Sequence, residues 1–131
     1  MSTSSPEATD RVFKVWEYQV SHGQLLIRSP KAPATNTSLE RTTNVDLACL
    51  GVEYMALPRL FRGLELAHPT RKELEQLESL LGRPIDSSNV RMLASEGKRF
   101  PVVAASFSLS ENDWDIFESP FEFRSQFRGP Q

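Results

Sequence analysis

"TNVDLACLGVEYMAL", residues 43–57, alternates apolar and polar residues over its first half, a pattern typical of a β-strand with one buried face. The apolar residues that share a face are Val45, Leu47 and Cys49 before Gly51, and Val52, Tyr54 and Ala56 after it. A glycine at such a change of phase indicates a bulge or a bend, because glycine weakens a strand and takes backbone angles that other residues avoid. We therefore expect one strand that bends, as a sheet does where it curls over a helix.

Residues 12–29, which precede this strand, predict a β-hairpin. Residues 12–20 are rich in β-branched and aromatic side chains, and "QLLIRS", residues 24–29, forms the second strand. The residues on the predicted buried face of the first strand are Val12, Trp16, Tyr18 and Val20. Between the strands, His22 and Gly23 fit a two-residue turn, because glycine takes a positive φ freely and histidine tolerates it better than most residues. The turn explains the position of His22 without any chemistry.

A helix is the clearest element downstream of residue 57. Thr70 and Glu73 have the spacing of a capping box, and Gly82 followed by a proline is a typical helix end. The apolar stripe consists of Leu74, Leu77, Leu80 and Leu81. This spacing predicts a helix over residues 70–82 that is long enough to cross one face of a sheet.

The segments on either side of this helix are less regular. "LPRLFRGLELAHP", residues 57–69, predicts a short helical turn followed by a connection. After the helix, residues 89–95 and 100–109 predict two strands of a second hairpin. Gly97 followed by Lys98 suits a type II′ turn, in which glycine comes first.

Runs of strands on either side of one helix, rather than alternating strands and helices, are typical of an α+β domain. We predict a single domain over residues 11–123, with a curved antiparallel sheet of five to six strands. The order of elements is βββ-α-ββ(β), with the helix packed on one face of the sheet. Residues 1–10 are small and polar and predict a disordered tail, and residues 124–131 predict a flexible one.

The charge balance of the chain argues against several classes of partner. Charged residues make up 24% of the sequence and the net charge is −2, so no global positive field attracts nucleic acid or anionic lipid. No apolar run approaches the ~20 residues that span a bilayer. The start, "MSTSSPEATD", does not have the pattern of a signal peptide. We expect a cytoplasmic protein that does not bind membranes, and nucleic-acid binding, through the arginines in and around the predicted helix, is the least favoured function.

The sequence contains little that points to catalysis. Cys49, the only cysteine, excludes an intrachain disulfide and lies within "LACLG", where a buried thiol acts as a small hydrophobic side chain. His22 and His68 lack the H-x-x-x-H or H-x-H spacing of a metal site. No G-x-S-x-G elbow, phosphate-binding loop or dinucleotide fingerprint occurs. We therefore predict no catalytic residue, no metal ligand and no cofactor.

The stretch "WEYQVSHGQLLIRS", residues 16–29, resembles the opening of a group of small, uncharacterised bacterial proteins, many of them actinobacterial. These proteins similarly read W-x-Y-x-V-S-H-x-x-L-L-x-R-S, and the resemblance extends more weakly to about Leu64. It implies a bacterial cytoplasmic origin and no particular activity, and it includes His22.

Two functions of different classes fit these observations. The one we favour is a non-enzymatic protein-binding or interaction domain, which recognises another protein or a second copy of itself. Small bacterial immunity proteins are one kind of binder that a curved sheet with one helix would suit. The alternative is a small-molecule-binding protein or modest enzyme, with its ligand between the helix and the curled sheet. The candidate ligand-binding residues for that alternative are Tyr18, His22, Arg28, Tyr54 and His68.

Overall fold

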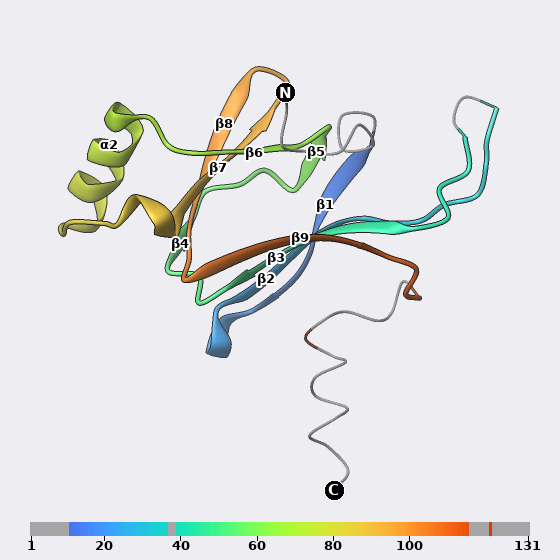
Figure 1. Cartoon of the computed structure of the whole chain (residues 1–131), viewed down its shortest axis with the longest axis horizontal. Helices are drawn as coiled ribbons and strands as arrows, with labels where there is room; N and C mark the ends of the chain where they lie inside the picture. The colour runs from blue at the N-terminus through green and yellow to red at the C-terminus, as the bar shows by residue number, and fades with distance from the viewer. Residues whose placement is uncertain (1–10, 37–38, 116–120, 122–131) are drawn as a thin grey trace, which may run out of the picture.

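The fold is that of a computed structural model, which describes residues 11–36, 39–115 and 121 (Figure 1). The tails expected at residues 1–10 and 124–131, and most of the last residues of the expected domain, lie outside these ranges. The described part is an α+β fold with one α-helix placed between two groups of strands along the chain. No helix within it is both long and apolar enough to cross a bilayer.

The strands of the described residues form two antiparallel sheets. The order of the five-stranded sheet is β5 (Leu60–Arg62), β1 (Val12–Gln19), β2 (Gln24–Ser29), β3 (Asn44–Leu50) and β9 (Ser106–Asn112). The order of the four-stranded sheet is β4 (Tyr54–Met55), β8 (Lys98–Val103), β7 (Val90–Ser95) and β6 (Glu65–Ala67). The helix α2 spans Arg71–Leu81, and two short 3₁₀ helices, η1 and η2, span Val20–His22 and Ser87–Asn89.

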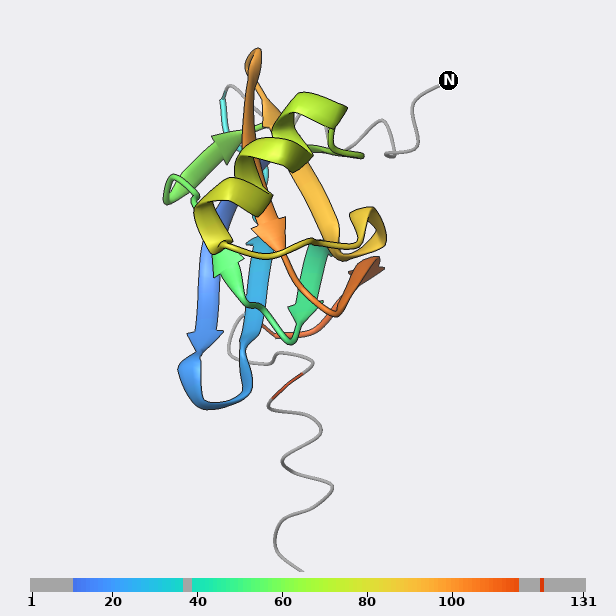
Figure 2. The same cartoon turned by 90° about the vertical axis from the view of Figure 1, so that its left-hand side faces the viewer.

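The helix and the two sheets stack as three layers (Figures 1 and 2). The main core lies between the sheets, where Phe13, Ile27 and Leu47 of the larger sheet pack with Leu93 and Val102 of the smaller one. A second core lies between the smaller sheet and α2. Its buried members are Leu77, Ile85, Val90, Met92 and Val103. The helix therefore covers one face of a sheet, as predicted, but this sheet is the smaller of two.

The prediction of one curved sheet with five to six strands is wrong, because the described chain has nine strands in two sheets. The predicted bend at Gly51 is the point at which the chain leaves β3 and enters the other sheet. Gly51 has a φ of +67°, and the amide of Ala105 donates to the carbonyl of Leu50 over 2.9 Å. Ala105 lies where the chain returns from β8 to β9, which splits the strand predicted at residues 100–109. The two points at which the chain passes from one sheet to the other therefore lie next to each other.

Residues 57–69 also differ from the prediction, since they form β5 and β6 rather than a helical turn. In β5, Phe61 is buried between Leu60 and Arg62, which are both exposed. This is the period of two that marks a half-buried strand, but three residues are too few for the pattern to be recognised in a sequence.

Both predicted hairpins are confirmed, and both turns differ from the predicted type. Gln19 pairs with Gln24, so the first turn has four residues, and of these only Gly23 has a positive φ. The second turn consists of Glu96 and Gly97, with φ values of 52° and 77°. Two positive φ angles in a two-residue turn define type I′ rather than type II′.

The helix is confirmed with its caps. The Thr70 hydroxyl accepts from the Glu73 amide, the Glu73 carboxylate accepts from the Thr70 amide, and Gly82 ends the helix in the left-handed conformation. Arg99 of β8 donates to the Glu73 carboxylate over 2.7 and 3.0 Å. This ion pair ties the first turn of α2 to the sheet beneath it.

Candidate functional site

The five residues predicted as ligand-binding candidates are distributed over separate parts of the fold. Tyr18 in β1, His22 in η1 and His68 after β6 are exposed, and the carbonyl of His68 accepts from Arg99. Tyr54 in β4 packs against the core beneath α2, and Arg28 in β2 is fully buried. None of the five lines either of the two cavities described below.

Arg28 has a structural role. Its Nε and Nη2 donate to the two carboxylate oxygens of Asp46 over 2.7 and 2.9 Å. Asn112 donates to the same carboxylate over 2.8 Å, and the guanidinium lies 5.6 Å from the centre of the Trp16 ring. Removing one member of a buried pair leaves a charge without compensation, so the pair fixes the positions of β2 and β3.

The polar network continues from this pair to the start of the segment after β9. The side-chain amide of Asn44 donates to the Asn112 side chain and to the carbonyl of Trp114, both over 2.9 Å. The side-chain oxygen Oδ1 of Asn44 accepts from the backbone amide of Lys31 over 2.9 Å. These bonds attach β9 firmly to β3 at the end where Asn112 lies.

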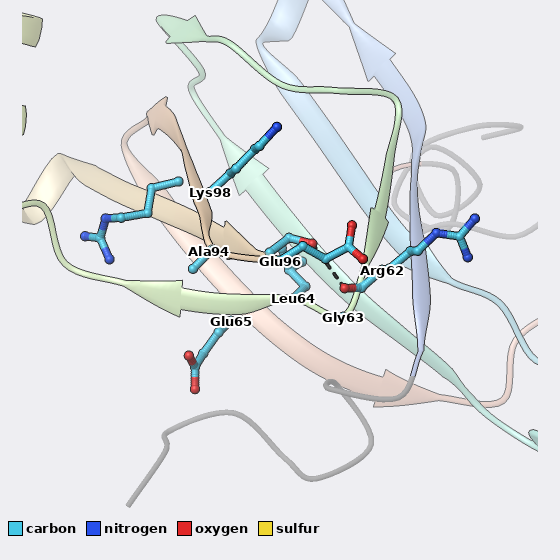
Figure 3. Close-up of a pocket in the computed structure, with 10 residues that line it drawn as sticks. Arg62, Gly63, Leu64, Glu65, Ala94, Glu96 and Lys98 are labelled. Atoms are coloured by element: carbon cyan, nitrogen blue, oxygen red, sulfur yellow. Dashed lines mark hydrogen bonds between the residues drawn. The ribbon is translucent and has the colours of Figure 1, made fainter.

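The larger cavity has a volume of about 560 Å³ and lies beside the β7–β8 turn, where Figure 3 shows it. That volume is within the usual range for a small-molecule site. Three of the labelled charged side chains, Arg62, Lys98 and Glu65, extend in different directions, however. Arg99, also part of the lining, is paired with Glu73. The arrangement provides no set of polar groups aimed at one ligand.

The smaller cavity, of about 230 Å³, lies near η2. Its charged groups already have partners within the chain. Arg83 forms an ion pair with Glu53. Asp86 accepts from the backbone amide and the hydroxyl of Ser88, which lowers the pKa of that carboxyl.

Cys49 is not placed as a reactive nucleophile, and the described residues contain no metal cluster. Cys49 is buried in the main core, and burial raises the pKa of its thiol to about 12. At neutral pH it is therefore a protonated core side chain, as the sequence predicted. No three histidine, cysteine, aspartate or glutamate side chains of the described chain are close enough together to hold a metal ion.

The most distinctive surface feature is the open edge formed by β9. The other three sheet edges of the described fold are β4, β5 and β6, which have two or three residues each. Short edge strands are one way in which proteins prevent unwanted strand pairing. β9 instead has seven residues, with neither lysine nor proline among them, and its sequence is SFSLSEN.

Among the residues that the structure describes, the outer side of β9 has no backbone partner. Residues 106–112 pair with β3 along their whole length. Within the described part of the chain, no other segment forms a backbone hydrogen bond with them. The outward N–H and C=O groups therefore form a row of free donors and acceptors, which is the geometry that an added strand requires.

The two faces of β9 differ in chemistry. One face carries Ser106, Ser108 and Ser110, opposite Leu50, Ala48 and Asp46 of β3. The other face carries Phe107, Leu109 and Glu111. The guanidinium of Arg91 in β7 lies 5.2 Å from the centre of the Phe107 ring, and Leu109 is 39% exposed. This edge was not predicted, because a sequence does not show which strand ends a sheet.

Comparison with known proteins identified no relative of the chain. No protein-family model, no curated protein and no solved structure matches the chain.

Proposed function

We propose that this protein is a non-enzymatic interaction domain that binds an extended segment of another polypeptide along β9. The observation that supports the proposal is the contrast between the long, unpaired edge of β9 and the short edges elsewhere in the described fold. Strand addition at such an edge gives affinity through main-chain hydrogen bonds, and the side chains beside the edge give specificity.

The side chains beside β9 indicate which kind of extended segment would bind there. Leu109 and Phe107 offer apolar contacts on one face, and Arg91 beside Phe107 offers a positive charge. A bound strand with alternating apolar residues on that face, and an acidic residue opposite Phe107, is complementary to this surface. The serines on the other face are small and uncharged, so they do not restrict the size or charge of the side chains that a bound strand places beside them.

The test is selection of binders from a library of extended eight- to ten-residue peptides, followed by amide hydrogen exchange of the protein with a selected peptide. We expect slower exchange of β9 amides in the complex. In the variant Ser108→Lys/Ser110→Lys, exposed lysines on the edge should weaken peptide binding about tenfold or more.

The matched control is Ser21→Lys/Ser87→Lys, which adds the same charge at exposed serines outside β9. This control should bind the selected peptides as the unsubstituted protein does. Peptides that bind without protecting β9, or that bind the edge variant and the control equally, would contradict the proposal. A library that yields no binder would contradict it as well.

A further inference from the structure

We infer that the strand that pairs with β9 in the free protein is β9 of a second copy, so that two five-stranded sheets join into one continuous sheet across a two-fold axis. This inference rests on the proposed function, because it identifies the partner of the same edge. An antiparallel pair of identical strands is self-complementary, so both copies contribute the same surface.

The longest register of such a pair is centred on Leu109, the middle residue of the seven. In that register every residue of β9 has a partner, and Leu109 lies directly opposite Leu109 of the second copy. Leu109, which is 39% exposed, thereby gains an apolar neighbour. Directly opposite side chains in antiparallel strands are about 4.5–5.5 Å apart at Cβ, close enough for the two leucines to pack.

The charges near β9 support the same register. Glu111 lies opposite Phe107 of the second copy, and Arg91 lies over that phenylalanine ring. Arg91 donates to the carbonyls of Ser88 and Val90 and forms no ion pair with a carboxylate of the described residues. The dimer would therefore bring Arg91 close to the Glu111 carboxylate of the second copy, which in its own chain also accepts a hydrogen bond from the Thr43 hydroxyl.

The register also avoids repulsion between like charges. Glu111 is the only charged residue of β9. The two copies of Glu111 are separated by four residue positions along the paired strands, roughly 13 Å at ~3.3 Å per residue. Because the axis is two-fold, each dimer contains two Arg91–Glu111 contacts, one at each end of the pair.

The first experiment measures the oligomeric state by sedimentation equilibrium over a range of concentrations. We expect a monomer–dimer equilibrium that Arg91→Glu and Glu111→Arg each weaken about tenfold or more, since each places like charges together at two symmetric contacts. The double variant Arg91→Glu/Glu111→Arg restores opposite charges and should recover dimerisation. The controls Arg62→Glu and Glu40→Arg make the same charge changes at exposed sites outside β9 and should dimerise normally.

The second experiment tests the register and does not depend on charge. Leu109→Cys should form a disulfide-linked dimer on mild oxidation, whereas Ser108→Cys alone should not, because residue 108 faces residue 110 of the other copy. A mixture of Ser108→Cys and Ser110→Cys proteins should give a cross-linked heterodimer. Cys49 is buried and should remain unlinked in all of these proteins.

The two proposals fail in different ways. A protein that is monomeric at all concentrations but protects its β9 amides when a selected peptide binds would overturn the dimer and leave the proposed function in place. A dimer that is insensitive to the charge swaps and does not cross-link at residue 109 would also overturn the inference. If neither peptide nor second copy protects β9, both proposals are wrong.

Discussion

The ion pair of Arg28 and Asp46 gives one predicted ligand-binding candidate a partner within the fold. Arg28 follows the apolar run of β2, and Asp46 lies between Val45 and Leu47, which are both buried. A charged residue within each of two buried strands is the signal that the two could pair with each other. In the structure they do pair, and Arg28 has no exposure to solvent.

Replacing Arg28 alone should destabilise the fold severely. In Arg28→Leu the carboxylate of Asp46 loses its buried partner, and we expect the free energy of unfolding to fall by about 3–5 kcal/mol. The double variant Arg28→Leu/Asp46→Leu removes both charges and should lose less than the single variant. Urea unfolding of the three proteins measures this, and equal losses in the single and double variants would contradict the prediction.

The thiol of Cys49 should be unreactive in the native protein. Burial raises the pKa of its thiol to about 12, so the reactive thiolate is nearly absent at pH 8. A colorimetric disulfide reagent should therefore react with less than a tenth of the thiol in native buffer, and with all of it in denaturant. Rapid reaction in native buffer would show that Cys49 is accessible.

At the scale of elements, His22 and Gly23 have different roles in the β1–β2 turn. A Cβ on Gly23 would lie 2.9 Å from the amide nitrogen of Val52, and Gly23 has a φ of +59°. His22 is exposed in the same turn. Gly23 therefore meets both a conformational and a packing requirement, whereas His22 meets neither.

Gly23→Ala should lower the free energy of unfolding by about 1–3 kcal/mol, because it combines left-handed strain with a backbone clash. His22→Ala, the neighbouring control, should change it by less than about 0.5 kcal/mol. Chemical denaturation of both variants is the measurement. A larger loss for the histidine variant would mean that His22 has a role that the turn does not explain.

The first turn of α2 should make stability depend on pH in the acid range. Hydrogen bonds from Arg99, and then from the Thr70 amide, lower the pKa of Glu73 below its ordinary value of 4.5. A carboxyl with a lowered pKa stabilises the fold above the pKa of the unfolded state and loses that contribution as the pH falls through the folded-state pKa. The pair is partly exposed, so we expect no more than about 1 kcal/mol.

Glu73→Gln keeps the capping geometry and removes the charge. The unsubstituted protein should be more stable than this variant at pH 7, and the difference should shrink as the pH falls below about 4.5. Thr70→Ala removes the cap itself and should lower the free energy of unfolding by about 1 kcal/mol at every pH measured. Urea unfolding at pH 7, 4.5 and 3 distinguishes the two cases, and a pH-independent difference for Glu73→Gln would contradict the first.

Local signals made the helix and both hairpins predictable. The capping box and the terminal glycine involve residues within one turn of each other, and they were confirmed. The buried face of β1 was not predictable in this way. Its register shifts between Val15 and Glu17, and within β1 Phe13 is buried whereas Val12 and Tyr18 are exposed. Val20, predicted on the same face, lies beyond β1 in η1 and is exposed as well. A bulge changes the phase of a strand without leaving a mark in its composition.

At the scale of the whole molecule, the number of sheets depends on contacts between distant residues. Gly51 and Ala105 meet where the chain changes sheets, and a Cβ on Gly51 would lie 2.9 Å from the Cβ of Ala105. The sequence indicated a bend at Gly51, but it did not indicate that the bend separates two sheets. The candidate edge was missed for the same reason, because β9 was predicted as the continuation of β8.

Gly51→Ala should destabilise the fold more than Gly82→Ala does. Both glycines have a positive φ, but only Gly51 has a neighbour within reach of the added methyl group. We expect a loss of about 1 kcal/mol for Gly82→Ala, from backbone strain alone, and about 2–4 kcal/mol for Gly51→Ala. Equal losses of stability in thermal or urea unfolding would show that the contact of the added methyl group with Ala105 has no energetic cost.

The pairing of β3 with β9 has a consequence for the protein while it is being made. Asn44 and Asn112 are hydrogen-bonded partners 68 positions apart, and β9 is the last strand of the described chain to leave the ribosome. Until then β3 has no neighbour on that side, and the surface that we propose for recognition does not exist. A half-synthesised chain therefore lacks the edge that the proposed interaction needs.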